Sequence, residues 1–169
     1  MVEQDLFRAA MARLGAAVNI VTSDGPMGRY GLAVSAVCSV TDDPPTVLVC
    51  VNRASKANET FKANGVLCIN VLAGRHEALS GRFSTPSLGM AERFGDETNW
   101  TRLDTGSPVL VDASVALDCA LASYREIGTH SVFFCEVRAV QLAEKAEGLV
   151  YFNRSYHHLG VPVLAGASG

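Results

Sequence analysis

The stretch GLAVSAVCSVTDDPPTVLVCVN, residues 31–52, contains two apolar runs separated by a turn-forming segment. Valine and small apolar residues dominate both runs, 31–41 and 46–52, as is typical of buried β-strands. The segment Asp-Asp-Pro-Pro between them favours a turn and does not continue a strand. Because so short a connection cannot make a parallel crossover, the two runs predict an antiparallel hairpin.

Alternation divides the side chains of the first run between two faces of the expected sheet. One face is apolar and is expected to belong to the core: Val34, Ala36, Cys38 and Val40. The other face carries small and hydroxyl-bearing residues: Ala33, Ser35, Val37, Ser39 and Thr41. This strand alone leaves two interpretations of the second face. It is either a solvated surface or a wall where a flat ligand meets the backbone and the hydroxyls.

The pattern of short strands continues on both sides of this hairpin. Further strands are expected at 17–23, 66–72, 114–124, 130–142 and 148–153, which makes about seven. Helical spacing predicts an amphipathic helix over 4–14 that covers one face of the strands, a helix from the N-cap Ser55 to Gly65, and another over 76–83. Residues 84–108 read as a long loop with one helical turn near 90–94. We therefore expect a mainly β, antiparallel barrel or sandwich with peripheral helices.

Composition limits the class of protein. The chain has 169 residues, of which 49% are hydrophobic and 18% charged, and this fits one globular domain. A net charge of −3 with scattered basic residues argues against a nucleic-acid partner. The N-terminal segment lacks an apolar run of signal-peptide or membrane-span length, so a soluble cytoplasmic protein is expected. The five cysteines lack CxxC spacing and are expected to be buried free thiols: Cys38, Cys50, Cys68, Cys119 and Cys135.

The segment NRASKANETF, residues 52–61, is a candidate anion site. It follows a strand and places Ser55 and Lys56 at a helix N-terminus, where free N–H groups and positive charge suit a phosphate, although serine caps are common in any protein. The usual nucleotide motifs are absent, since GPMGRYG, residues 25–31, joins two strands and is not GxGxxG, and no Walker motif occurs. A nucleotide would therefore be held on a β-barrel surface.

A second candidate is the segment REIGTHSVFFCEV, residues 125–137. Gly128 begins a turn, and Thr129 and His130 stand at the start of the next strand, where a side chain can face a ligand. A histidine in such a place is also commonly solvated or satisfied by the protein itself, and the same holds for His157 and His158. The histidines and cysteines show no metal-ligand spacing, so no metal site is expected.

Taken together, these segments resemble the short-chain flavin reductases that serve two-component flavin monooxygenases. That family includes the reductase component of 4-hydroxyphenylacetate 3-monooxygenase and the flavin reductase of pyrimidine degradation. The resemblance extends over nearly the whole chain, through FRAAMARLGAAVNIVTSDGP, SAVCSVTDDPPTVLVCVNR, NGVLCINVLA, IGTHSVFFCEV and GLVYFNRSYHHLG. It implies one flavin reductase-like domain over residues 1–169, with 160–169 as a flexible tail. The implied fold is an FMN-binding split β-barrel that forms a homodimer.

The resemblance also implies the roles of particular residues. The flavin ring is expected against the strand of Val34, Ser35, Ala36 and Ser39, with main-chain groups and Ser35 at its polar edge. Asn52, Ser55 and Lys56 match the ribityl and phosphate contacts, and Arg82 with Phe83 matches a further flavin contact. On the nicotinamide side the family pattern points to His130 as the catalytic residue, joined by Arg154 and Tyr156. Thr129 departs from the Gly-Asp-His version of this turn, so no carboxylate acts there.

The implied activity is reduction of FMN or FAD by NADH, or by NADPH, with transfer of the reduced flavin by diffusion to a monooxygenase. Hydride transfer between stacked rings requires mainly positioning and no acid–base pair. Two other functions remain open on the same barrel. One is a flavin-binding or sensor module without turnover, and the other is an oxidase related to pyridoxamine-phosphate oxidase, for which a more basic second site is expected.

Overall fold

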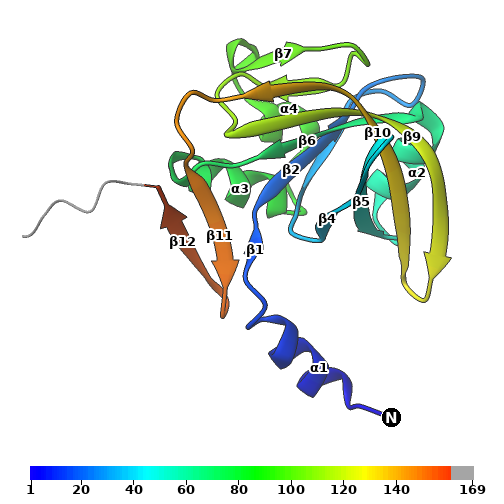
Figure 1. Ribbon diagram of the computed structural model, residues 1–169, viewed down its shortest axis with the longest axis vertical. Coiled ribbons are helices and arrows are strands. Elements are labelled where there is room, and N and C mark those ends of the chain that lie inside the picture. The colour runs from blue at the N-terminus through cyan, green and yellow to red at the C-terminus, as the bar shows by residue number, and fades with distance from the viewer. Residues whose placement is uncertain (161–169) are drawn as a thin grey trace, which may run out of the picture.

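The computed structural model describes residues 1–160, and the expected tail beyond Gly160 lies outside this range. Seven antiparallel strands form the main sheet in the order β3-β2-β6-β9-β10-β5-β4 (Figure 1). They are β2 (Asn19–Ser23), β3 (Tyr30–Val34), β4 (Val37–Asp42), β5 (Pro45–Asn52), β6 (Val66–Val71), β9 (Val115–Ile127) and β10 (His130–Leu142). The expected mainly β, antiparallel fold is confirmed.

The two edges of this sheet are joined by only two residues. β3 and β4 are the outermost strands, yet Ser35 and Ala36 connect them directly. The sheet must therefore curl until its edges are neighbours, which makes a barrel that stays split between β3 and β4. At the split, the Asn19 side-chain amide donates to the carbonyl oxygen of Val34 at 3.0 Å, and the amide of Cys50 donates to that of Ala36 at 3.0 Å.

Three smaller groups of elements complete the fold. A three-stranded sheet combines β1 (Ala16–Ala17), β11 (Gly148–Phe152) and β12 (Ser155–Leu159), and β7 (Trp100–Arg102) pairs with β8 (Pro108–Leu110). The helices are α1 (Gln4–Met11), α2 (Lys56–Asn64), α3 (Glu77–Ser84) and α4 (Met90–Phe94), with short 3₁₀ turns η1 (Gly74–His76) and η2 (Glu97–Asn99). Helix α3 contacts β3 at the split edge of the barrel, and β11 and β12 lie beside η1, the turn that precedes α3.

Apolar side chains fill both sides of the sheet. The barrel interior contains Val21, Val49, Phe61, Leu67, Ile69 and Phe133, all fully or almost fully buried. A second cluster lies between the sheet and the helical side and contains Ile20, Leu72, Phe83, Phe94 and Leu110. Strand β2 is buried along its whole length because its alternate side chains enter the two clusters.

The predicted helix boundaries at α2 are confirmed. The Ser55 side chain accepts a hydrogen bond from the amide of Ala57 at 3.3 Å, and Gly65 ends the helix with a left-handed φ of 68°. The helices near 76–83 and 90–94 are also present as α3 and α4. The interval 84–108 is more ordered than expected, since it also contains η2 and β7, and β12 follows β11 where no strand was expected.

Two expectations about burial are wrong. The run 31–41 is not one strand: it leaves β2 after Val34 and joins β5 at Val37, so its alternation is interrupted and Ala36, Cys38 and Val40 are exposed instead of entering the core. Helix α1 covers no face of the sheet, because none of its residues is buried and it projects from the body of the chain (Figure 1).

All five cysteines are free thiols, as expected, but they are not all buried. Cys68, Cys119 and Cys135 are buried, Cys50 is half-buried and Cys38 is exposed on β4. Burial raises the pKa of the Cys135 thiol to about 12 and raises the pKa of Cys119 as well. These two core thiols therefore stay protonated and inert at neutral pH.

Candidate functional site

A groove runs along β3, on the side where the barrel is split. It consists of two cavities that adjoin because Ala33 and Ser84 line both. The first, here the Tyr156 pocket, has a volume of about 370 Å³ and is lined by Val18, Ala33, Val34, Ser35, Ser80, Ser84, Tyr151, Arg154 and Tyr156. The second, the Lys56 pocket, has about 420 Å³ and is lined by Tyr30, Leu32, Ala33, Ser55, Lys56, Phe83, Ser84, Pro86 and Arg93. We call the two together the β3 groove.

The Lys56 pocket is suited to an anion. Lys56 and Arg93 contribute two positive charges, and the N-terminus of α2 at Ser55 adds the positive end of the helix dipole. None of the described residues that line the pocket is acidic. A phosphate group would therefore meet only favourable charges there.

The Tyr156 pocket has a different chemistry. Tyr151 and Tyr156 pack edge to face with their ring centroids 5.2 Å apart, and the Tyr156 hydroxyl lies 3.1 Å from the Ser80 hydroxyl. Arg154 reaches the pocket from the β11–β12 turn, where its φ of 64° is left-handed. Aromatic rings, hydroxyls and one cation suit a planar ring system with a polar edge.

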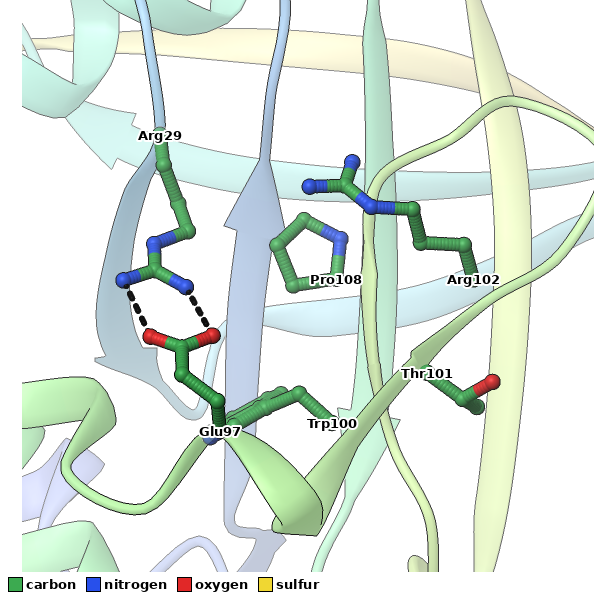
Figure 2. A pocket seen from close by; sticks show the side chains of 6 residues that line it. All are labelled: Arg29, Glu97, Trp100, Thr101, Arg102 and Pro108. Atoms are coloured by element: carbon green, nitrogen blue, oxygen red, sulfur yellow. Dashed lines mark hydrogen bonds and ion pairs between the residues drawn. The ribbon is translucent and has the colours of Figure 1, made fainter.

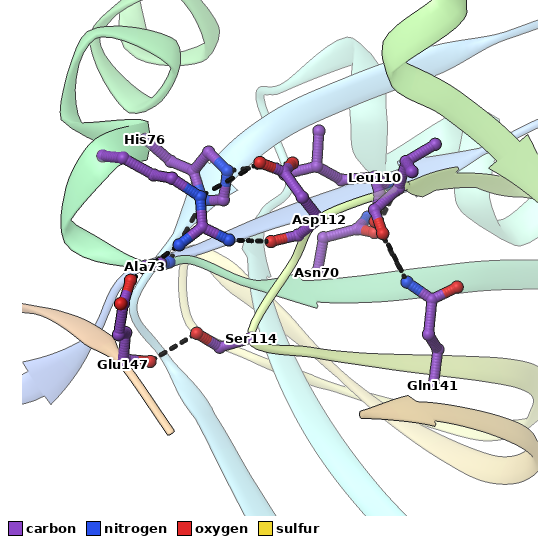
Figure 3. Close-up of polar contacts among 10 residues, drawn as sticks. Asn70, Ala73, His76, Leu110, Asp112, Ser114, Gln141 and Glu147 are labelled. Atoms are coloured by element: carbon purple, nitrogen blue, oxygen red, sulfur yellow. Dashed lines mark hydrogen bonds and ion pairs between the residues drawn. The ribbon is translucent and has the colours of Figure 1, made fainter. Parts of the chain in front are cut away.

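Helix α3 forms one wall of the groove, and a polar network fixes its first turn (Figure 3). The His76 Nδ1 accepts from the amide of Ala73 at 3.1 Å, so Nε2 carries the proton and donates to Asp112 Oδ1 at 3.0 Å. Arg75 binds Asp112 at 3.0 Å and Glu147 at 2.6 Å. Burial would raise the pKa of Asp112, but the hydrogen bonds from Arg75 and His76 outweigh it and hold this pKa below its ordinary value. The network thereby positions Ser80, which follows one turn later.

A third cavity, of about 400 Å³, is lined by charged residues that pair with one another (Figure 2). Arg29 donates two hydrogen bonds of 2.7 Å to the carboxylate of Glu97, and Arg102 pairs with Asp24 at 2.7 Å. Arg29 also lies 4.3 Å from the centre of the Phe94 ring. Because each cation here is neutralised by a carboxylate, the cluster ties the β2–β3 hairpin to the segment before β7 and offers little charge to a ligand.

The structure brings seven of the twelve expected site residues to the β3 groove. They are Val34, Ser35, Ser55, Lys56, Phe83, Arg154 and Tyr156. Two others line separate cavities: Ser39 lies with Val40 in an apolar hollow between β4 and β10, and Arg82 lies beside Trp100 on the other side of α3. Ala36, Asn52 and His130 line none of the cavities described here.

His130 and Asn52 are directly opposite each other on β10 and β5. The turn before His130 is held by Arg53, whose amide donates to the carbonyl oxygen of Thr129 at 2.9 Å and whose side chain pairs with Glu126 at 3.0 Å. The Asn52 side chain accepts from the amide of Ala54 at 2.9 Å and so shapes the approach to α2. His130 itself is exposed. Segments 52–61 and 125–137 are therefore neighbours through Asn52 and His130, but neither of these two residues lines the β3 groove.

Several groove residues were not found from the sequence. Ser80 and Ser84 are one turn apart on α3, so their helical spacing was a usable signal. No sequence signal pointed to Tyr151 or Arg93. The place of Tyr151 depends on the pairing of β11 with β12, and that of Arg93 depends on how α4 packs against β3.

No helix within residues 1–160 has the length and apolar character required to cross a membrane. The same residues contain no group of three or more histidine, cysteine, aspartate or glutamate side chains placed to hold a metal ion.

The fold and site define a split antiparallel β-barrel protein with a ligand-sized groove along one edge, and comparison with known proteins identifies its family. A family model described as the flavin reductase like domain matches residues 11–160, and the chain belongs to this family. FMN reductase (NADH) RutF of Variovorax paradoxus (strain S110) is 54% identical over 158 residues, which cover 92% of this chain and 86% of that protein.

Solved structures agree with this assignment. A Haemophilus somnus 129PT protein assigned as a flavin reductase has a TM-score of 0.88 and 43% identity, with 94% of this chain and 100% of that chain covered. A homologue of nitrilotriacetate monooxygenase component B from Mycobacterium thermoresistibile has a TM-score of 0.84 and 25% identity, with 92% and 86% covered. The expected fold and family are thereby confirmed.

Proposed function

We propose that this protein is an NADH-dependent flavin reductase that acts on FMN. The observation that carries the proposal is the β3 groove, in which an anion-binding pocket adjoins a pocket of rings and hydroxyls. FMN has these two parts, a phosphate and a planar ring system. The relative at 54% identity, named FMN reductase (NADH), supports the choice of FMN and NADH over FAD and NADPH.

The two pockets of the groove suit the two parts of FMN, since one is basic and the other is lined by rings and hydroxyls. Ser55, Lys56 and the α2 N-terminus would hold the phosphate, and Phe83 would line the path between the pockets. Val34, Ser35 and Ser80 would contact the ring and its polar edge. Flavin, when bound, supplies the two-electron chemistry that side chains lack. The protein contributes orientation and the exclusion of water.

Arg154 and Tyr156 would border the nicotinamide, because both reach the ring-binding pocket from the β11–β12 hairpin. His130 is proposed as the catalytic residue on the nicotinamide side, on the resemblance alone, since it lies outside the groove of its own chain. His130→Ala is then expected to raise the apparent KM for NADH. Unchanged kinetics in this variant would remove His130 from the site. Alanine variants of Ser39, Asn52 and Arg82, together with Ala36→Val, would decide the roles of these four residues when the KM for FMN is measured.

We propose that the protein works as a homodimer. Large apolar side chains are exposed on α1 and on β4 and β10: Leu6, Phe7, Met11, Val40, Val140 and Leu142. Val40 and Val140 border the same apolar hollow of about 300 Å³. Exposed apolar surface of this kind is typical of an interaction site, and a second copy is the partner that family resemblance favours.

The reduced flavin is proposed to pass by diffusion to a flavin-dependent monooxygenase in the cytoplasm. The likeness to a monooxygenase component at 25% identity supports this partner class. Five free thiols suit a reducing compartment.

The test is a turnover assay with purified protein, FMN and NADH, followed by NADH absorbance. Consumption of many NADH equivalents per protein with FMN supports the reductase, and repetition with FAD and NADPH ranks the substrates. Binding of one flavin without turnover would support the sensor module instead. Turnover of a phosphorylated amine without NADH would support the oxidase.

A further inference from the structure

Arg93 of α4 is a buried cation in the wall of the Lys56 pocket. Its side chain is held by four hydrogen bonds to backbone carbonyl oxygens: Nε to Leu88 at 3.0 Å, Nη1 to Gly31 at 3.1 Å and to Phe83 at 3.4 Å, and Nη2 to Thr85 at 3.0 Å. Only 7% of the residue is exposed. The guanidinium is therefore fixed in place and almost fully removed from water.

This charge lacks a compensating carboxylate. Within residues 1–160, six other arginines form ion pairs with acidic side chains, namely Arg8, Arg29, Arg53, Arg75, Arg102 and Arg138, whereas Arg93 has no carboxylate oxygen within 4.0 Å. Carbonyl oxygens solvate a guanidinium but do not neutralise it. A buried, uncompensated positive charge is costly, and an anion that binds beside it relieves that cost.

Arg93 also organises the wall on which the ligand would rest. Three of its four acceptors lie at the end of α3 (Phe83) or between α3 and α4 (Thr85 and Leu88), and the same stretch contributes Ser84 and Pro86 to the pocket. A guanidinium has five N–H donors, so one hydrogen on Nη2 has no acceptor within the described chain. The side chain thus combines a fixed position, an unneutralised charge and a spare donor.

We propose that Arg93 is a positioning residue that sets the affinity of the groove for the flavin phosphate, and hence the preference for FMN over riboflavin. The proposal rests on the proposed function, because it takes flavin as the ligand. Lys56 is exposed and its charge is screened by solvent, whereas the charge of Arg93 acts from inside the protein, where screening is weak.

The experiment compares the dissociation constants of FMN and riboflavin, measured by flavin fluorescence, in the wild type and in Arg93→Met. Damage to the wall weakens both ligands alike, but loss of the charge weakens FMN alone. We expect the ratio of riboflavin to FMN dissociation constants to fall by about tenfold or more, as is usual when one charge-assisted contact is lost. Arg93→Lys, which restores a charge, should recover part of the ratio. Equal weakening of both ligands would overturn the proposal.

A matched control and a second variant keep the result interpretable. Arg29→Met removes another arginine that contacts Phe94 but is neutralised by Glu97, so it should leave the ratio unchanged. If Arg93→Met does not fold, Arg93→Gln decides the matter, because it keeps N–H donors for the carbonyl oxygens but carries no charge: a lower ratio supports the proposal, and an unchanged ratio overturns it. The turnover assay is separate, since flavin that binds with this preference but is not reduced would refute the reductase and leave the role of Arg93 intact.

Discussion

Strands β3 and β4 follow each other in the chain and have opposite environments. In β3, every residue is buried or half-buried, and Ala33 and Val34 line the groove. In β4, five of the six residues are exposed. The difference comes from what covers them: both are edge strands with one partner, β2 or β5, but α3 packs against β3. Two strands joined by only two residues therefore form a groove wall in one place and an open surface in the other.

The largest expected effect comes from filling the groove at its narrow point. Ala33 lines both pockets, so Ala33→Phe should obstruct the ligand where the pockets join. We expect kcat/KM for FMN reduction to fall by about 100-fold, the scale of a misplaced reactant. Val111→Phe, at a site that is 50% exposed and outside the groove, is the control and should keep wild-type kinetics. Normal activity in Ala33→Phe would show that flavin binds elsewhere.

The β4 side is tested by placing charges around its apolar hollow. The double variant Val40→Asp with Val140→Asp should reduce the mass in solution to the 17.9 kDa of one chain, because desolvated like charges at a dimer interface are unfavourable. Light scattering after size exclusion measures this mass, with Val111→Asp as the control. If the wild-type protein has the mass of one chain, the homodimer proposal is contradicted.

Cys38 reports on the same surface without altering the interface. It is the one exposed thiol within residues 1–160, and it lies on β4. If a second copy covers β4, native protein should react with a thiol reagent about tenfold more slowly than the monomeric double variant. Equal and fast labelling in both proteins would mean that β4 is open to solvent.

A smaller effect is expected from the hydrogen bond across the Tyr156 pocket. Tyr156→Phe removes the hydroxyl that lies 3.1 Å from Ser80 and should raise the KM for NADH about fivefold, equivalent to about 1 kcal/mol. Tyr151→Phe is the matched control, because within residues 1–160 its hydroxyl makes no hydrogen bond. Identical KM values for both variants would exclude a role for the Ser80 contact.

The smallest effect concerns the network below α3. Folding holds the pKa of Asp112 below its ordinary 3.8, so its contribution to stability is complete above that pH and is lost as the pH falls through the lower, folded value. Asp112→Asn should lower the Tm at pH 6 by about 1–3 °C, and this difference should shrink below about pH 3.8. A difference that is constant with pH would contradict this account.

The sequence alone determined most strands of the main sheet, the turn between β4 and β5, and the ends of α2. These features depend on contacts between residues near one another in the chain, such as the Ser55 cap and the left-handed Gly65. The basic end of the groove was predictable for the same reason, because Ser55 and Lys56 are neighbours at one helix terminus. Ser35 lines the groove, although the alternation from which its face was deduced breaks at that residue.

Only the tertiary structure decided which apolar segments are covered and which residues from distant segments meet. The break at Ser35–Ala36 follows from a change of strand partner, from β2 to β5, and no local pattern encodes a partner. Arg93 enters the groove because α4 packs back onto Gly31, which is 62 residues away. Burial and charge compensation are properties of the assembled chain, so the uncompensated cation and the open face of β4 exist only after folding.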